Sequence, residues 1–193
     1  MYALSGGHDK MICCMNFFRC AKCVKLDAYD RRQHQMCIRH RTCRVVKEDK
    51  SFMDGKVTKL DVAIRFKNRK GTAETHVLVF LPNKAREPVP AFMMLSFDNP
   101  RGGGFHLSSS RKGYLRNGVP LGQLVDQGYA YVSVYHGDLV GHNEVSFSGG
   151  IHKLFFRDGQ SFPKAHEWGV LTANGWTGMR ALDYLETNDR VDA

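Results

Sequence analysis

The sequence predicts an α/β fold, a mostly parallel sheet that starts with an antiparallel pair of strands. Two observations predict it. Apolar and polar residues alternate over residues 57–66, and from residue 91 on extended apolar runs alternate with stretches of helical spacing. The resulting order is strand, strand, strand, helix, strand, helix, in which parallel strands are joined by helical crossovers.

The first two strands are expected to form the antiparallel pair. Residues 57–66 place Leu60, Val62, Ile64 and Phe66 at every second position, which is the pattern of a half-buried strand. A polar stretch ending in Gly71 supplies a turn, and residues 75–81 form the second strand. Residues 91–97 (AFMMLSF) predict a third strand, apolar on both faces as in a covered parallel sheet.

The remaining elements alternate helix and strand. Pro120 at a first-turn position, apolar residues at helical spacing and Gly128 as a stop predict a helix over 120–128, followed by a buried strand over 129–135 (YAYVSVY). A long loop over 136–165 is expected to carry function. The last helix is predicted over 167–186, where apolar residues recur every three positions and where Trp168 and Trp176 share one stripe, which favours core packing over sugar stacking.

Charge and cysteine divide the chain into two segments. The formal net charge of +9 is concentrated at the start, because residues 1–50 contain 11 basic and 5 acidic residues while residues 111–193 contain 8 and 9. All six cysteines lie before residue 44. We therefore expect residues 1–54 to be a basic, Cys-rich leader that is poorly ordered, and residues 55–193 to form the folded unit. No apolar run is long enough to span a membrane.

The cysteine segment carries one alternative function. Cys20 and Cys23, followed by Cys37, His40 and Cys43, resemble the ligand spacing of a small zinc site, and neighbouring arginines would suit phosphate groups. This spacing keeps open a zinc-type nucleic-acid-binding module fused to an inactive α/β remnant. The basic leader matches no fold pattern, so we expect neither a metal site nor a nucleic acid partner.

Four blocks of sequence carry a family resemblance. They are LVFLPNKAREPVPAFMMLSF (78–97), GYAYVSVYHGDL (128–139), GGIHKLFF (149–156) and EWGVLTANGWTGMRALDYLETNDRVDA (167–193). Together they resemble the N-terminal half of the glucuronoyl esterases, carbohydrate esterases that are often labelled acetylxylan-esterase-like. The resemblance implies an incomplete α/β-hydrolase sheet over residues 55–193 and a serine esterase, without metal or cofactor, that acts on esters of plant cell-wall glucuronoxylan.

The catalytic groups of such an esterase are not expected in this chain. The resemblance implies a Gly-x-Ser-Arg-x-Gly-Lys elbow after the strand that would continue from Ala193, with the acid and histidine later still, and no Gly-x-Ser-x-Gly occurs in the sequence. The chain as given is therefore expected to be inactive. Members of this family are usually exported, but residues 11–24 are interrupted by Arg19 and Lys22 and lack a cleavage site, so the sequence does not predict a location.

Two groups of residues are candidates for the substrate side of the site. Phe97, Asp98 and Asn99 follow the third strand, where this fold supplies an oxyanion-hole N–H. Asp98 and Pro100 depart from the Gly-Asn-His-like family pattern, and a carboxylate beside an oxyanion would oppose it. The Gly-rich run 102–105 resembles another esterase oxyanion loop, but its distance from the strand favours an ordinary flexible loop.

The second group comprises the substrate-loop candidates His136, Asp138 and His152. His136 and Asp138 leave the end of a buried strand, a position where α/β folds hold ligands. A triad of Ser133, His136 and Asp138 is disfavoured because its serine would be buried in a strand without an elbow. His142, His152 and His166 have no partner fixed by spacing and are expected to be surface or packing residues.

Overall fold

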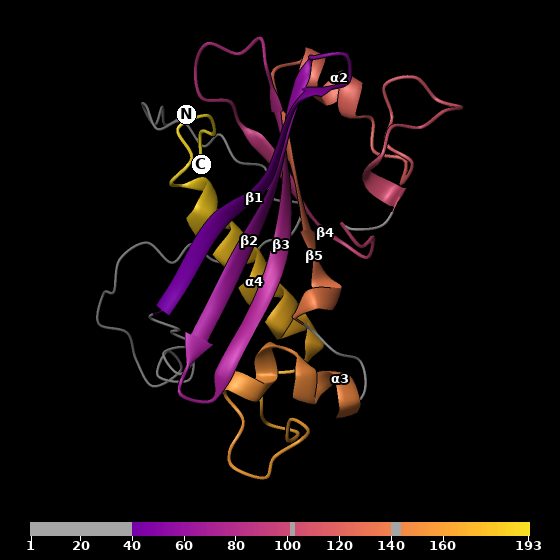
Figure 1. The fold of residues 1–193 in the computed structure, drawn as a ribbon. Helices are drawn as coiled ribbons and strands as arrows, with labels where there is room; N and C mark the ends of the chain where they lie inside the picture. Colours follow the sequence, from indigo (N-terminus) through magenta and orange to yellow (C-terminus); the bar gives the residue numbers. More distant parts are fainter. Residues whose placement is uncertain (1–39, 101–102, 140–143) are drawn as a thin grey trace, which may run out of the picture.

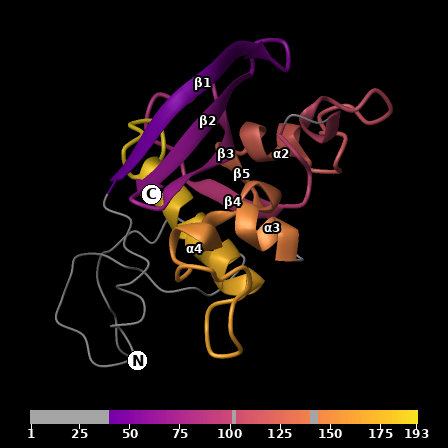
Figure 2. The ribbon, with the colours of Figure 1, turned by 60° about the horizontal axis from the view of Figure 1, so that its bottom comes forward.

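The computed structural model describes residues 40–100, 103–139 and 144–193, which form one mixed sheet with helices on both faces (Figures 1 and 2). The strands are β1 (His40–Phe52), β2 (Val57–Asn68), β3 (Gly71–Pro82), β4 (Ala91–Ser96) and β5 (Ala130–Tyr135), arranged in the order β1-β2-β3-β5-β4. The helices are α2 (Leu121–Asp126), α3 (Glu144–Gly149) and α4 (Val170–Leu185). Short 3-10 turns cover Gly103–Phe105, His136–Asp138 and Ile151–Leu154.

The strands β2 to β5 run in the directions that the sequence predicts. β2 and β3 are antiparallel over their whole lengths, β4 and β5 are parallel, and β5 lies between β3 and β4. The crossover from β4 to β5 carries α2, as expected for parallel neighbours. This arrangement confirms an α/β sheet with an antiparallel start, and it leaves β1 and β4 at the two edges.

Alternating side chains divide the core into two layers. One layer lies under α4 and includes Val62, Ile64, Val79 and Val132, together with Trp176, whose ring centroid is 4.8 Å from that of Phe66. The other layer lies under α2 and includes Leu78, Phe80, Phe105 and Tyr131. Successive residues of a strand point to opposite faces. Both faces of β3 and β5 are covered by a core layer, so these central strands are apolar on both sides.

β1 is an element that the sequence analysis did not predict. It occupies residues 40–52, inside the segment expected to be a poorly ordered leader, and it pairs with β2 from His40–Lys67 to Phe52–Val57. Most of its side chains are exposed, so it shows no apolar alternation that a sequence reading could detect. The other residues of the expected leader, 1–39, lie outside the described residues.

Two further expectations need correction. The predicted loop over 136–165 contains α3 and two 3-10 turns, and the last helix begins at Val170, so Trp168 precedes the helix instead of sharing its stripe with Trp176. β4 is also less covered than its apolar sequence suggests, because it lies at an edge and Met94 is 41% exposed. No described helix is long and apolar enough to cross a membrane.

Candidate functional site

The candidate residues after β4 and β5 gather at one end of the sheet. β4 and β5 are parallel and in register from Ala91–Ala130 to Ser96–Tyr135, so the residues that follow them emerge side by side. Phe97 and His136 meet there, with ring centroids 4.4 Å apart in an edge arrangement. His136 is buried, whereas Phe97 is 80% exposed. The carboxyl ends of parallel strands are where open α/β sheets place ligands.

Asp98 is held in a local turn. Its backbone N–H donates to Ser96 Oγ at 3.0 Å, which engages the donor that an oxyanion site would need from this residue. Its side chain packs against Gly104, where an added Cβ would lie 3.1 Å from Asp98 Cγ. A side chain at position 104 would therefore require Asp98 to shift by a few tenths of an ångström. Asp98 is therefore poorly suited to offer its own backbone N–H to an oxyanion.

The Gly-rich run is anchored at its described end. Gly103–Phe105 form a 3-10 turn, Phe105 is fully buried, and its carbonyl accepts a hydrogen bond from Lys59 Nζ at 3.3 Å. The carbonyl of Gly104 accepts from the backbone N–H of Asn117 at 3.0 Å. Lys59 also lies over the rings of Phe52 and Phe80, and this burial lowers the pKa of its ammonium. These contacts correct the expectation of an ordinary flexible loop for residues 103–105.

Asp138 connects the end of β5 to the edge of β3. Its carboxylate accepts the backbone N–H of His76 at 3.2 Å, just beyond the last β3–β5 pair, Val77–Val134. His76 Nδ1 in turn lies 2.7 Å from Asp61 Oδ1 on β2. The sequence analysis did not identify this cluster, although Asp61 and His76 occupy polar positions on the same face of two strands predicted to pair. Asp138 therefore fixes the turn that follows β5.

His152 lies apart from this group. It is fully buried within aromatic rings, with the centroid of Phe147 at 4.6 Å and that of Trp168 at 4.4 Å. Neither ring nitrogen has a hydrogen-bond partner of normal geometry in the described structure. Burial lowers the pKa of His152, and the backbone of Trp168 and Gly169 opposes that shift only in part. This placement favours a packing role over substrate contact.

The structure also locates the residues of the disfavoured triad and one further histidine. Ser133 is buried within β5 at 2% exposure and has no elbow to present it, so the triad Ser133, His136 and Asp138 has no accessible nucleophile. His166 is exposed, and His142 lies outside the described residues.

Of the proposed zinc ligands, Cys20, Cys23 and Cys37 lie outside the described residues. Cys43 is on β1 with an exposed side chain, and desolvation raises the pKa of its thiol although Arg41 lies nearby. Within the described ranges no cluster of three His, Cys, Asp or Glu side chains could hold a metal ion.

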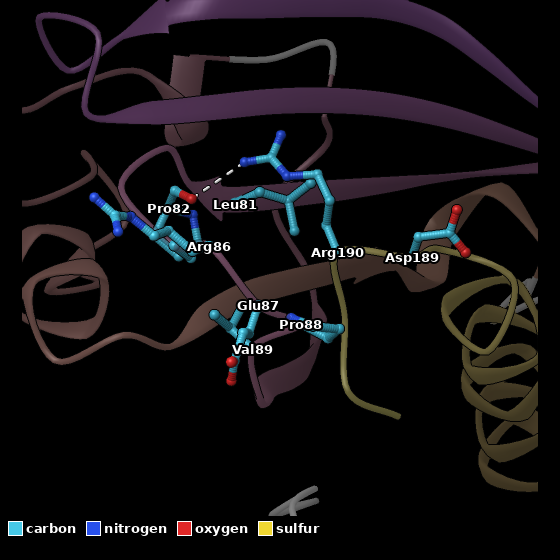
Figure 3. A pocket seen from close by; sticks show the side chains of 9 residues that line it. Leu81, Pro82, Arg86, Glu87, Pro88, Val89, Asp189 and Arg190 are labelled. Atoms are coloured by element: carbon cyan, nitrogen blue, oxygen red, sulfur yellow. Dashed lines mark hydrogen bonds between the residues drawn. The ribbon is translucent and has the colours of Figure 1, made fainter.

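A small pocket lies at the opposite end of β4. Its volume is about 90 Å³, and its lining includes Arg86, Glu87, Val89 and Arg190 (Figure 3). Arg190 Nη2 donates to the carbonyl of Pro82 at 3.1 Å. Because this pocket adjoins the start of β4, whereas Phe97 and His136 follow the strand ends, it is separate from the candidate site.

The fold and the strand-end loops define a class, a partial sheet of the α/β-hydrolase type. No protein-family model matches the chain. A glucuronoyl esterase from Solibacter usitatus superposes with a TM-score of 0.64 and 26% identity, over 80% of this chain and 44% of that chain. A glucuronoyl esterase from Teredinibacter turnerae shares the fold, with a TM-score of 0.51 and 20% identity over 80% of this chain and 37% of that chain.

A curated relative agrees with the solved structures. Carbohydrate esterase MZ0003, from an unknown prokaryotic organism, is 23% identical over 72% of this chain and 37% of its own length. The resemblance to glucuronoyl esterases that the sequence predicts is therefore confirmed, and the chain spans less than half the length of the relatives it matches.

Proposed function

We propose that this chain is the scaffold and oxyanion-side portion of a serine esterase that cleaves glucuronoyl esters of cell-wall glucuronoxylan. The observation that supports the proposal is the similarity in both fold and sequence to the Solibacter usitatus glucuronoyl esterase. The meeting of Phe97 and His136 after the parallel strands β4 and β5 also supports the proposal, because α/β-hydrolases supply an oxyanion-hole N–H from the loop after such a strand.

The chemistry that this portion supplies is positioning and electrostatic stabilisation. Attack by a serine on the ester carbonyl would place negative charge on its oxygen, and backbone N–H groups after β4 would stabilise that charge. The sequence as given contains no Gly-x-Ser-x-Gly. The nucleophile, the general base and the acid would therefore come from residues outside this 193-residue sequence.

The experiment is a chimera. Residues 40–193 replace the matching portion of the Solibacter usitatus enzyme, and hydrolysis of a benzyl glucuronate ester is measured. We expect turnover that a serine-directed phosphonate abolishes, and the same chimera with its elbow serine changed to alanine is the matched control. The 193-residue chain alone should show no turnover. A folded chimera without activity would argue against the proposal, as would phosphonate-sensitive turnover by the chain alone.

A further inference from the structure

Two basic segments of the chain meet at the end of the sheet that carries the candidate site. Because β3 is antiparallel to β5 and Val77 pairs with Val134, the start of β3 lies beyond the end of β5. Figure 1 shows the β2–β3 turn there, beside the segment that follows α3. Five basic residues lie in these two segments, and we call them the basic tip. They are Lys67, Arg69 and Lys70 around the β2–β3 turn and Lys153 and Arg157 after α3.

Hydrogen bonds hold the two segments together. Asn68 Nδ2 donates to the carbonyl of Leu154 at 2.7 Å, and Lys70 Nζ donates to the carbonyl of Phe156. The members of each pair are 86 positions apart in the sequence, so the fold brings these cations together.

The segment after α3 is also tied to the turn that follows β5. Ile151 N–H donates to the carbonyl of Leu139 at 2.7 Å, and Leu139 directly follows the 3-10 turn His136–Asp138. The basic tip is therefore fixed to the loops of the candidate site.

Most of the charge of the basic tip has no partner within the described residues. Four of the five residues are exposed, and Lys153 is partly exposed. In the described ranges only Lys70 of the five forms an ion pair, with Asp158 at 3.9 Å. An anion from outside the chain could therefore contact the other four cations without displacing a carboxylate.

The basic tip lies away from the edge at which the sheet is expected to continue. In the sheet, β5 separates β3 from β4. Val191 bridges to Val89 on the side of β4 that faces away from β5, so a strand that continued from Ala193 would add there and not beside the β2–β3 turn.

The composition of the basic tip favours carboxylates over nucleic acid. Proteins that bind single-stranded nucleic acid place exposed aromatic rings between their cations. The rings of these two segments are instead packed inside, since Phe66 and Phe156 are buried and Phe155 packs against the core. Arginine pairs well with carboxylates, because its planar guanidinium can donate two parallel hydrogen bonds.

We propose that the basic tip binds the free carboxylates of a uronate-bearing polysaccharide, at sugars that flank the ester to be cleaved. This inference rests on the proposed function, because it takes the same polymer as the ligand. An esterified uronate carries no charge at its carboxyl, so the cations contact unesterified uronates elsewhere on the chain of sugars. Several weak contacts along one polymer reinforce one another, since each contact after the first is intramolecular.

The test is the binding of unesterified glucuronoxylan by the full 193-residue chain. This ligand has no ester to cleave, so the result does not depend on esterase activity. We expect binding at about 20 mM salt that weakens severalfold at about 200 mM salt, because salt screens exposed charges. The same polysaccharide should not bind after its carboxyl groups have been reduced to alcohols.

A pair of double variants locates the binding surface. Arg69→Glu/Arg157→Glu reverses one charge in each segment and should weaken binding about tenfold. Lys84→Glu/Arg86→Glu is the matched control, because it makes the same change in charge at exposed positions after the opposite end of β3 and should bind like the wild type. Circular dichroism checks that both variants remain folded.

The outcomes separate this proposal from the esterase proposal. Absence of binding, equal losses in the two double variants, binding that survives carboxyl reduction, or tighter binding of RNA through the same residues would overturn the role of the basic tip. An inactive chimera together with binding that Arg69→Glu/Arg157→Glu weakens would contradict the esterase proposal alone.

Discussion

The imidazole of His152 stacks on the indole of Trp168, with ring centroids 4.4 Å apart and ring planes inclined by 24°. His152 lies in the 3-10 turn Ile151–Leu154 and Trp168 lies just before α4, so their contact joins the segment after α3 to the start of that helix. A buried neutral imidazole suits this aromatic environment, whereas an imidazolium would lose its hydration without gaining a carboxylate. Protonation of His152 would therefore weaken this packing, so the stability of the fold should depend on pH.

We predict that acidification destabilises the fold through His152. Burial lowers its pKa in the folded chain, so the unfolded chain binds more protons, and stability falls as the pH drops through the ordinary histidine pKa of about 6.5. His152→Phe keeps an aromatic ring and should remove this part of the pH dependence. Thermal unfolding midpoints measured from pH 8 to pH 5 provide the test. His166→Phe, at an exposed position, should keep the wild-type profile; an unchanged profile in His152→Phe would contradict the assignment.

Gly122 is expected to tolerate no side chain although it lies in a helix. A Cβ added to Gly122 would lie 3.1 Å from the Cα and 3.2 Å from the carbonyl oxygen of Gly113. The N–H of Gly122 already donates to that carbonyl at 2.7 Å. Gly122→Ala should therefore cost about 1–3 kcal/mol, the usual effect of overpacking. Urea denaturation measures it. Gly175→Ala, in α4 with open space around it, should instead stabilise by about 0.5–1 kcal/mol; equal effects at the two sites would exclude the steric explanation.

Asp138 should contribute to stability through the backbone of β3. Asp138→Ala leaves the His76 N–H without its carboxylate acceptor, and a half-buried donor without a partner costs about 1–3 kcal/mol. Asp138→Asn retains a side-chain oxygen and should recover most of the loss. The free energy of unfolding in urea distinguishes the two variants. If both variants lose the same stability, the negative charge and not the hydrogen bond carries the effect.

β1 should stabilise the sheet despite its exposed side chains. A chain starting at residue 40 keeps the β1–β2 ladder and the ion pair between Arg41 and Asp183 of α4, whereas a chain starting at residue 55 exposes the edge of β2. We expect the longer chain to unfold at a higher temperature and to aggregate less. Scanning calorimetry and light scattering measure these outcomes. Equal behaviour of the two chains would instead place the boundary of the folded unit at residue 55, as the sequence alone suggests.

The sequence predicted the central sheet because the burial of a strand gives its sequence a characteristic hydrophobic pattern. Leu60 and Val62 alternate with Lys59 and Asp61 on β2, whereas Val132 lies in a mostly apolar run whose two faces are both covered. β1 has no such hydrophobic pattern, because β2 supplies its backbone hydrogen bonds while most of its side chains are exposed to solvent. The strand depends on pairing between distant residues, which local patterns do not encode.

The candidate site was predicted only at the level of strand ends. Phe97 and His136 were each expected after a strand, but the contact between their rings was not predicted. The hydrogen bonds of Asp98 and Asp138 were not predictable, because both arise from turn geometry that one-dimensional spacing does not determine. The roles of these residues toward a substrate remain predictions.

The bridge between Val89 and Val191 also bears on the order of folding. It joins segments separated by about a hundred residues, and bringing such distant segments together costs more chain entropy than closing the β2–β3 hairpin. Non-local pairings of this kind form late. During folding the β2–β3 hairpin can therefore form before the segment around Val191 reaches Val89, so the start of β4 is completed later than the antiparallel pair.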